Sequence, residues 1–343
     1  MHSTRSTYRR TKRAALAVAA TALAVTLATE PGGAASAGTA PFNNGTGSAT
    51  ALGYKVNPTN GNLSFGITFG EAIAGHQNTA ATGQSRAINL GVIGVTLAGE
   101  ACDGGPPTMA EKDQPQPVIA RSGEKGAAEG MTATEKPGGI EKYARATTAP
   151  FAEAITTIGP MGDPATLFIN GGRTITHSGV INGNTREALA RTELGTVSIG
   201  GGAVELKGLT WQAIHRSGAV NETIGTFSIG SASIGGQVQS LPGDGFQQAA
   251  ALNALLKPLG LNLTPPGVRV EQGIVFVDPL KIGVIPSPER DAVLGGVISG
   301  AQPVRDQIVD ALLKQDCGNA TYVTIGDIVL GSFTGAGALL LEL

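Results

Sequence analysis

Aromatic and charged side chains are both scarce in this sequence. The 343 residues include nine Phe, four Tyr and one Trp, and only 15% are Asp, Glu, Lys or Arg. Soluble globular proteins usually have about 25% charged residues, and charged disordered chains have more. The formal charge is only −2 at pH 7, so the basic excess that marks nucleic-acid binding is missing. Composition therefore excludes a highly charged disordered chain and a coiled coil, and it predicts no nucleic-acid partner.

The sequence also lacks the short motifs of common catalytic and cofactor sites. It contains no phosphate-binding loop, no GxGxxG turn after a strand, no HExxH zinc motif and no CxxC pair. Gly83 to Ala87 approaches the GxSxG pattern around Ser85, and Ser122 with Lys125 matches SxxK. Neither has the flanking elements or companion motifs that these active sites need. We therefore predict no catalytic residue and no cofactor.

Beyond the N-terminal region, the histidines are His76, His177 and His215. No two of them have the spacing that places metal ligands together on one strand or helix. A metal site would need the fold to bring them together, so we predict no metal. His215 and Trp211 lie on the same strand face by two-residue periodicity, and we expect the histidine to cover the tryptophan at the end of the strand.

The N-terminal region has the three parts of a secretory signal. Five basic residues between Arg5 and Arg13 precede an uncharged run, Ala14–Ala28, and Ala35–Ala37 offers a small-residue cleavage site. The alternative is an uncleaved membrane anchor, but this run is shorter than the ~20 residues that span a bilayer. We predict a signal peptide over residues 1–37 and a secreted, extracellular or cell-surface location.

Export has consequences for the charge and for the two cysteines. Cleavage after Ala37 removes five positive charges and one negative charge, which lowers the formal charge from −2 to −6 and disfavours docking to anionic lipid. No later apolar run is long enough to span a membrane. Cys102 and Cys317 are an even pair in an oxidising compartment, so we predict that they form a disulfide, with two unpaired thiols as the alternative.

The remaining chain divides into three parts by hydrophobic pattern. Residues 38–102 are predicted to be an N-terminal β segment, with a hairpin signal at Asn60-Gly61 followed by alternating apolar residues. Residues 103–150 contain six prolines, seven glycines and 13 charged residues. Such a stretch buries too little apolar surface to offset the entropy of ordering it, so we interpret it as a loop or linker. Residues 151–343 are the predicted main β-rich domain.

Two local signals in this main domain predict hairpins. Asn182-Gly183 follows a run that alternates as a strand does, from Ile175 to Ile181, and this dipeptide favours a two-residue hairpin turn. A pattern at Leu194–Gly200 recurs at Ile224–Gly230. The recurrence predicts two equivalent strands in neighbouring hairpins, although two copies are too few to indicate a solenoid.

Two stretches of the main domain have helical signals. Asp244 is a suitable cap for a helix near residues 245–258, and Ser287 with Pro288 begins a second near 288–315. The predicted fold class is therefore α+β and β-dominated, with mostly antiparallel strands and two or three amphipathic helices in the C-terminal third.

About half of the chain resembles a group of exported bacterial proteins. The features that carry the resemblance are the signal peptide, Thr226–Gly230 with Ala232–Gly236, the Ala251–Leu256 helix, and Cys317 ahead of a final strand pair. They are similar to uncharacterised actinobacterial exported β-rich proteins, in the style of choice-of-anchor envelope proteins. The resemblance implies surface attachment and transfers no functional residue. The sequence departs from this pattern after Leu343, where the usual anchor is missing, so free secretion, retention by a partner and truncation all stay open.

Three functions remain open from the sequence. The leading hypothesis is an exported, non-catalytic β-rich protein of the cell envelope or extracellular space. It would act as a structural or interaction component, with cell-envelope components or another surface protein as partners. The first alternative is a carrier of an apolar ligand such as a lipid, lined by the apolar stripes at 246–256 and 304–313. The second is a secreted hydrolase whose site combines scattered acids. These acids are Asp244, Asp278, Glu289 and Asp291.

Overall fold

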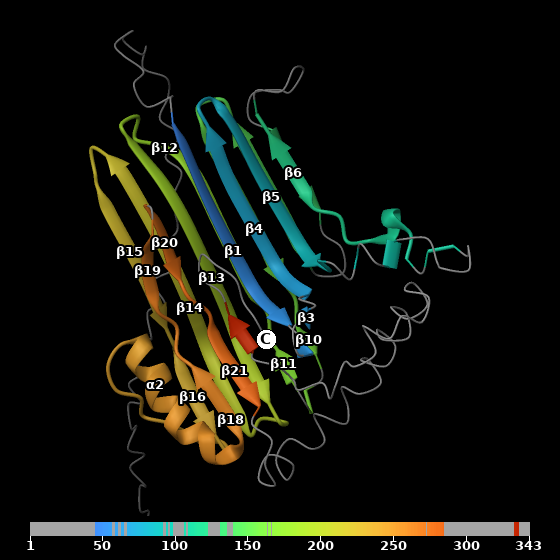
Figure 1. Ribbon diagram of the computed structural model, residues 1–343, viewed down its shortest axis with the longest axis vertical. Helices are drawn as coiled ribbons and strands as arrows, with labels where there is room; N and C mark the ends of the chain where they lie inside the picture. The colour runs from blue at the N-terminus through green and yellow to red at the C-terminus, as the bar shows by residue number, and fades with distance from the viewer. Residues whose placement is uncertain are drawn as a thin grey trace, which may run out of the picture. The chain divides into compact units, whose positions relative to one another are not determined.

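Two antiparallel β-sheets, one of seven strands and one of eleven, make up most of the structure (Figure 1). The computed structural model describes residues 45–284 and 333–335, except for 57–58, 61–62, 65–66, 92–93, 95–96, 99–105, 108, 123–130, 136–139, 163, 166 and 272. All of the described residues belong to one unit that spans residues 40–343.

The seven-stranded sheet has the order β18-β21-β22-β1-β4-β5-β6. Its strands are β1 (Thr46–Val56), β4 (Ile67–Gln77), β5 (Ala80–Asn89), β6 (Val118–Arg121), β18 (Leu261–Thr264), β21 (Leu280–Val284) and β22 (Phe333–Gly335). Every pairing in this sheet is antiparallel.

The eleven-stranded sheet has the order β17-β16-β14-β13-β12-β9-β8-β7, with β15 beside β14 and the β10-β11 pair beside β13. Its strands are β7 (Met131–Glu135), β8 (Glu141–Thr147), β9 (Phe151–Ile158), β10 (Met161–Gly162), β11 (Leu167–Ile169), β12 (Gly172–Ile181), β13 (Thr185–Ile199), β14 (Val204–Gly218), β15 (Glu222–Ser228), β16 (Ser231–Ile234) and β17 (Gln237–Val238). Two separate hairpins join β2 (Thr59–Asn60) to β3 (Leu63–Ser64) and β19 (Val268–Glu271) to β20 (Ile274–Val277).

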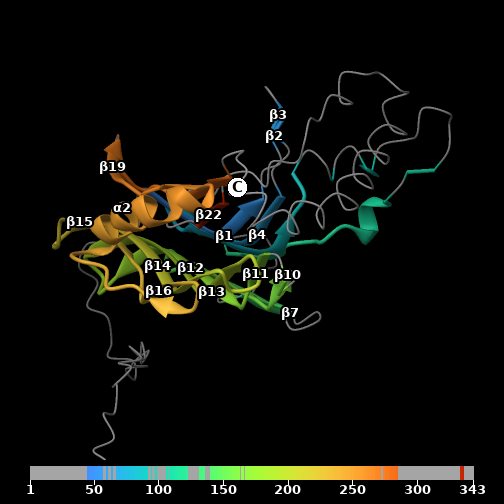
Figure 2. The same cartoon turned by 90° about the horizontal axis from the view of Figure 1, so that it is seen from below.

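The two sheets face each other as two layers (Figure 2). Burial alternates residue by residue along β4, β9 and β12, as expected when one face of a strand is covered and the other is not. We call the side of each sheet that faces the other sheet its inner face, and the opposite side its outer face.

Small side chains fill the interior between the central strands. The fully buried inner residues of β4, β5, β8 and β9 are Ala72, Ala74, Ser85, Ala144, Ala146, Ala152, Ala154 and Thr156. Stacked sheets usually lie about 10 Å apart, with larger side chains between them. Here Ser85 Oγ donates to the Ile155 carbonyl at 2.7 Å, and Thr156 Oγ1 donates to the Glu71 carbonyl at 2.8 Å. The two backbones therefore come close enough for side chains of one sheet to bond the main chain of the other.

Two adjacent glycines leave a hole that a side chain of the other sheet occupies. Gly53 of β1 and Gly70 of β4 lie side by side, and Gly70 has a positive φ of 70°. A Cβ atom at either position would lie 2.4 Å or less from Cδ1 of Ile158 in β9. Beside this hole, Thr192 Oγ1 donates to the Leu52 carbonyl at 2.8 Å. Glycine is therefore required here, because any side chain would displace Ile158.

Large side chains gather around β14 and the helix α2 (Gly245–Leu256). Trp211 is fully buried, its ring centroid lies 4.9 Å from that of Phe227, and Phe227 lies 6.0 Å from Phe246 of the helix. The helix begins as its sequence predicts, because the Asp244 side chain accepts from the Gln247 amide at 3.0 Å and the Gln247 side chain accepts from the Asp244 amide. The predicted helix near 245–258 is therefore confirmed.

The predicted α+β class is wrong in its helix content. The β-dominated, mostly antiparallel character is confirmed. In the described part of the C-terminal third, however, the helical structure is a single segment, α2 followed by the 3₁₀ turn η2 (Lys257–Leu259), not two or three helices. The second predicted helix, near 288–315, lies outside the described residues. The physical reason is that the two sheets cover each other's inner faces, so no helical layer is needed to bury them.

Residues 103–150, interpreted from composition as a loop or linker, contribute β6, β7 and β8 to the sheets. The buried inner residues of these strands include Ala120, Ala144 and Ala146. Where the facing backbones lie so close, an alanine side chain is large enough to fill the space between them. The scarcity of large apolar residues in this stretch therefore did not indicate disorder. The seven-stranded sheet also combines strands from 38–102 with strands from 151–343, which joins these two predicted parts in one sandwich.

Gly83 provides a test of the close approach between the sheets. In Gly83→Ala, the new Cβ would lie 2.4 Å from the Glu153 carbonyl and 2.9 Å from the Arg145 carbonyl, both main-chain atoms of the facing sheet. We expect the free energy of unfolding to fall by about 1–3 kcal/mol, because the sheets must separate to admit the methyl group. Urea denaturation measures this change.

Gly75→Ala is the matched control on the neighbouring strand. Its Cβ would meet no atom closer than the Gly47 carbonyl, at 3.6 Å, so we expect a change of less than about 0.5 kcal/mol. Equal losses of stability in the two variants would contradict the close packing described here.

Candidate functional site

The outer face of the eleven-stranded sheet carries rows of side chains that run across its strands. Antiparallel pairing aligns one row from Tyr143 in β8 through Ile155 in β9 and Ile175 in β12. The row continues with Arg191 in β13 and Gln212 in β14, and all five side chains are half-buried. Cross-strand neighbours of this kind stabilise a sheet by about 0.2–1 kcal/mol per pair. The face is therefore a broad surface of mixed apolar and charged groups.

A cluster of four charged or titratable side chains, the Glu187 cluster, lies on this face. Glu187 is only 6% exposed, and its two carboxylate oxygens bond His177 Nε2 and Arg216 Nε separately. Arg216 also pairs with Glu222. These residues come from β12, β13, β14 and β15, so the cluster ties four neighbouring strands together.

The cluster keeps Glu187 ionised. The hydrogen bond with His177 is the largest influence and, together with Arg216, it holds the pKa of Glu187 below its ordinary value even though burial acts in the opposite direction. A carboxylate beside a histidine is one way to orient a general base. Here, however, both carboxylate oxygens are occupied and the His177 ring stacks on Phe151, with centroids 5.7 Å apart. The arrangement therefore serves to lock strands together.

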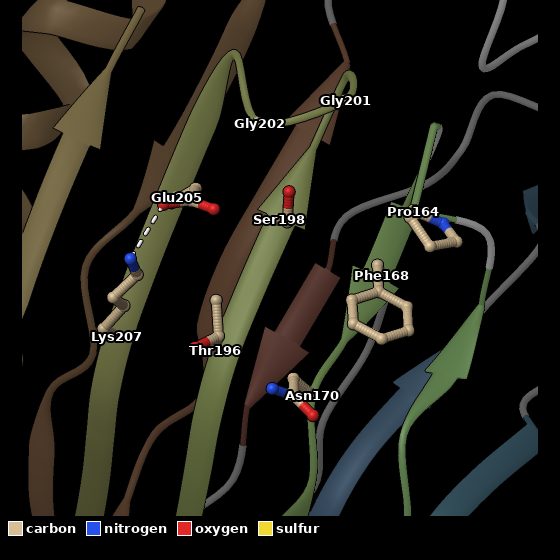
Figure 3. Close-up of a pocket in the computed structure, with 9 residues that line it drawn as sticks. All are labelled: Pro164, Phe168, Asn170, Thr196, Ser198, Gly201, Gly202, Glu205 and Lys207. Carbon is tan, nitrogen blue, oxygen red and sulfur yellow. Dashed lines mark ion pairs between the residues drawn. The ribbon is translucent and has the colours of Figure 1, made fainter. Parts of the chain in front are cut away.

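A groove opens on the same face where β11, β13 and β14 lie side by side (Figure 3). Its volume is about 400 Å³. The strand register brings the lining of the groove together in two cross-strand rows. Phe168, Ser198 and Glu205 form one row, and Asn170, Thr196 and Lys207 form the next. We call this feature, with these six residues, the β11–β14 groove.

The groove presents polar groups that are available for a ligand. Within the described parts of the chain, the side chains of Asn170, Thr196 and Ser198 have no hydrogen-bond partner. Ser198 is only 8% exposed, yet it lines the groove. Lys207 Nζ lies 2.9 Å from Glu205 Oε2, so the two charges compensate each other. The groove is therefore polar but carries no net charge among these residues.

A second buried polar pair lies between the sheets. His76 of β4 is 6% exposed, and its Nδ1 lies 3.0 Å from the Ser178 hydroxyl of β12. Burial, followed by the positive charge of Arg186, lowers the pKa of His76, so the ring is neutral at pH 7. A Cβ at Gly47 would lie 2.6 Å from this ring, so the backbone of β1 packs closely against it.

The two serines from partial catalytic motifs have structural roles. Ser85 is fully buried between the sheets, where it bonds the Ile155 carbonyl and lies 2.7 Å from Thr156 Oγ1. Ser122 Oγ accepts from the Ala81 amide at 2.9 Å, and Lys125 lies outside the described residues. Neither serine is placed as an accessible nucleophile.

The fold does not bring the three histidines together. His76 and His215 lie on inner faces, and His177 lies on an outer face. His215 Nδ1 lies 3.4 Å from the Thr223 hydroxyl, and it shares its strand face with Trp211, as expected. In the described ranges, no three His, Cys, Asp or Glu side chains gather closely enough to hold a metal ion.

Other predictions concern membranes and cysteines. No helix within residues 45–284 or 333–335, as far as these are described, is long and apolar enough to cross a membrane. Cys102 and Cys317, the predicted disulfide, lie outside the described residues. The Glu187 cluster and the β11–β14 groove were not predicted from the sequence. The only signal related to the groove is the repeat at Leu194–Gly200, which contains Thr196 and Ser198.

Comparison of the chain with protein-family models, with curated proteins and with solved structures found no match. Function is therefore inferred from the residues and their geometry.

The Glu187 cluster predicts a pH-dependent contribution to stability. In Glu187→Gln, we expect the free energy of unfolding at pH 7 to fall by about 1–3 kcal/mol, because a buried charged hydrogen bond is lost. Since the pKa of Glu187 is lower in the folded than in the unfolded state, the wild-type advantage is present above the ordinary glutamate value of about 4.3 and disappears as the pH falls through the lowered pKa. Urea denaturation between pH 3 and 8 measures both effects.

Glu193→Gln is the control on the same strand. Its carboxylate pairs with Arg191 at the surface, where both side chains are 38% exposed, so we expect a loss of less than about 1 kcal/mol. A loss in Glu187→Gln that is the same at pH 3 and pH 7 would show that the charge of Glu187 does not stabilise the fold.

Proposed function

We propose that this protein is an exported, non-catalytic component of the cell envelope or extracellular space that acts through a binding surface. The sequence feature in favour of export is the basic, apolar and small-residue pattern of residues 1–37. The structural observation that carries the proposal is the outer face of the eleven-stranded sheet. Its half-buried apolar side chains lie beside charged ones across five strands, a composition that suits a protein interface.

The packing of α2 disfavours the apolar-ligand carrier. Ala249, Leu252 and Leu256 belong to the same buried cluster as Trp211 and Leu263. The helix stripe therefore fills the core and does not line a ligand cavity. The other stripe, at 304–313, lies outside the described residues.

The hydrolase alternative also receives no support from the described acids. Asp244 caps α2, and Asp278 accepts a hydrogen bond from Arg269 Nε at 2.9 Å. Both carboxylates are thus engaged in local structure. Glu289 and Asp291 lie outside the described residues.

Cell fractionation tests the export part of the proposal. We expect the native protein in the envelope or the medium, with an N-terminus that begins after Ala37, as read by mass spectrometry. A soluble cytosolic product that retains residues 2–37 would refute export, and with it the proposed function.

A pair of substitutions tests the binding surface. Ile175→Glu introduces a charge into the outer face of the eleven-stranded sheet, and Ile73→Glu does the same on the outer face of the seven-stranded sheet; both side chains are half-buried. We expect Ile175→Glu to reduce the envelope-bound fraction several-fold and Ile73→Glu to leave it unchanged, with equal secretion and thermal stability as controls. Equal retention of both variants would mean that this face does not bind the envelope.

A further inference from the structure

We infer that the β11–β14 groove binds a neutral sugar ring, as part of a polysaccharide or glycan at the cell surface. This inference rests on the proposed function, because only an exported protein meets the glycans of the cell surface, and it adds a second site on the face that carries the proposed protein-binding surface. It draws on four observations: an aromatic wall, free hydroxyl and amide groups, compensated charges, and the direction in which the polar rows run.

The aromatic wall is Phe168 of β11. Figure 3 shows its ring at one side of the groove, with Thr196 and Ser198 on β13 in the middle and Glu205 with Lys207 on β14 at the other side. Phe168 is half-buried and not part of the buried core. The face of an aromatic ring carries partial negative charge, and the C–H-rich face of a pyranose carries partial positive charge. A sugar ring therefore fits flat against this side chain.

The groove floor supplies the hydrogen bonds that sugar hydroxyls need. A sugar hydroxyl both donates and accepts, and so do the hydroxyls of Thr196 and Ser198 and the amide of Asn170. These three side chains have no partner within the described structure. Although the Ser198 residue is nine-tenths buried, its hydroxyl is not shut off from solvent, so a ligand in the groove can reach it. The volume of about 400 Å³ lies within the range of about 300–1,000 Å³ for small-ligand sites.

The charges of the groove favour a neutral ligand. Glu205 and Lys207 form an ion pair at 2.9 Å, so neither is left to attract an anion or a cation. A phosphate or sulfate group would need an excess of positive charge, and a lipid tail would leave the polar floor without partners. A neutral, polyhydroxylated ring needs no excess of positive charge, and its hydroxyls can form hydrogen bonds with the polar floor.

The polar rows continue beyond the groove in the direction that a chain of sugars would take. On β16, Ser233 lies opposite Glu205 and Ser231 lies opposite Lys207. Each row thus crosses from β11 through β13 and β14 to β16, and both serines are half-buried. A linear polysaccharide lying across the strands would contact Phe168 with one ring and these serines with a ring further along, because β11 and β16 are three strand spacings, or about 14 Å, apart.

Affinity electrophoresis of the purified protein without residues 1–37 tests the inference. Native gels would contain a β-glucan, a galactomannan or a xylan as neutral polymers, and dextran sulfate as the anionic comparison. We expect at least one neutral polymer, and not dextran sulfate, to retard the protein. Phe168→Ala should then raise the Kd at least about tenfold, as for an aromatic anchor residue, and Phe168→Trp should retain binding.

Controls separate the groove from general effects on the fold. Phe276→Ala removes a half-buried ring outside the groove, beside Arg269, and Thr226→Ala changes the repeat's counterpart of Thr196; both should bind as the wild type does. If Phe168→Ala no longer unfolds cooperatively, Asn170→Ala tests the groove instead. Asn170 is exposed, so this substitution should weaken binding several-fold without loss of stability.

Three results would overturn the inference: no retardation by any neutral polymer, retardation that is unchanged in the groove variants, or retardation by dextran sulfate alone. If one of them occurs while the protein is exported and Ile175→Glu still releases it from the envelope, the proposed function stands without this site. Binding of a neutral polymer by a protein that stays in the cytosol would instead refute the proposed function alone.

Discussion

The close approach of the two sheets is the constraint on which the rest of the structure depends. Alanine, serine, threonine and glycine fill the space between β4, β5, β8 and β9, so each residue buries less apolar area than in a core of leucine and phenylalanine. Hydroxyl groups compensate in part, because Thr156 and Thr192 bond carbonyls of the facing sheet. A net gain of about 1 kcal/mol is typical for each such bond. This packing leaves no room for aromatic side chains between these strands, in agreement with the low aromatic content of the sequence.

A tightly closed interior places the candidate binding groups on the outer faces. The long strands β13 and β14 carry both of the features found there, and an interruption in their pairing separates the two. Leu194 pairs with Leu209 and Thr196 pairs with Lys207, so Gly195 and Gly208 are left between these pairs, and Gly208 has a positive φ of 63°. On one side of this interruption the neighbour of β13 is β12, which supplies His177 to the Glu187 cluster. On the other side it is β11, which supplies Phe168 to the groove.

Local signals in the sequence predicted local structure well. Asp244 caps α2 through a capping box, and Asn182 and Gly183 both adopt the positive φ of the predicted hairpin turn between β12 and β13. Composition was a poor guide where the burial of a residue depends on its surroundings. Ala144 and Ala146, for example, are core residues only because the facing sheet lies so near. The groove could not be predicted either, because Phe168, Ser198 and Glu205 become neighbours only through strand pairing.

The amino-acid sequence alone determined that the chain is β-dominated and antiparallel, where its helix α2 begins, and that no common catalytic motif is present. These properties depend on periodicity, caps and turns, whose physical causes lie within a few residues of one another. The tertiary structure decided which strands face each other, which of the small residues form the core, and which polar side chains meet at the Glu187 cluster and in the groove. Those outcomes depend on register and packing between segments that are distant in the chain, and the energy of such contacts exists only once the sheets have formed.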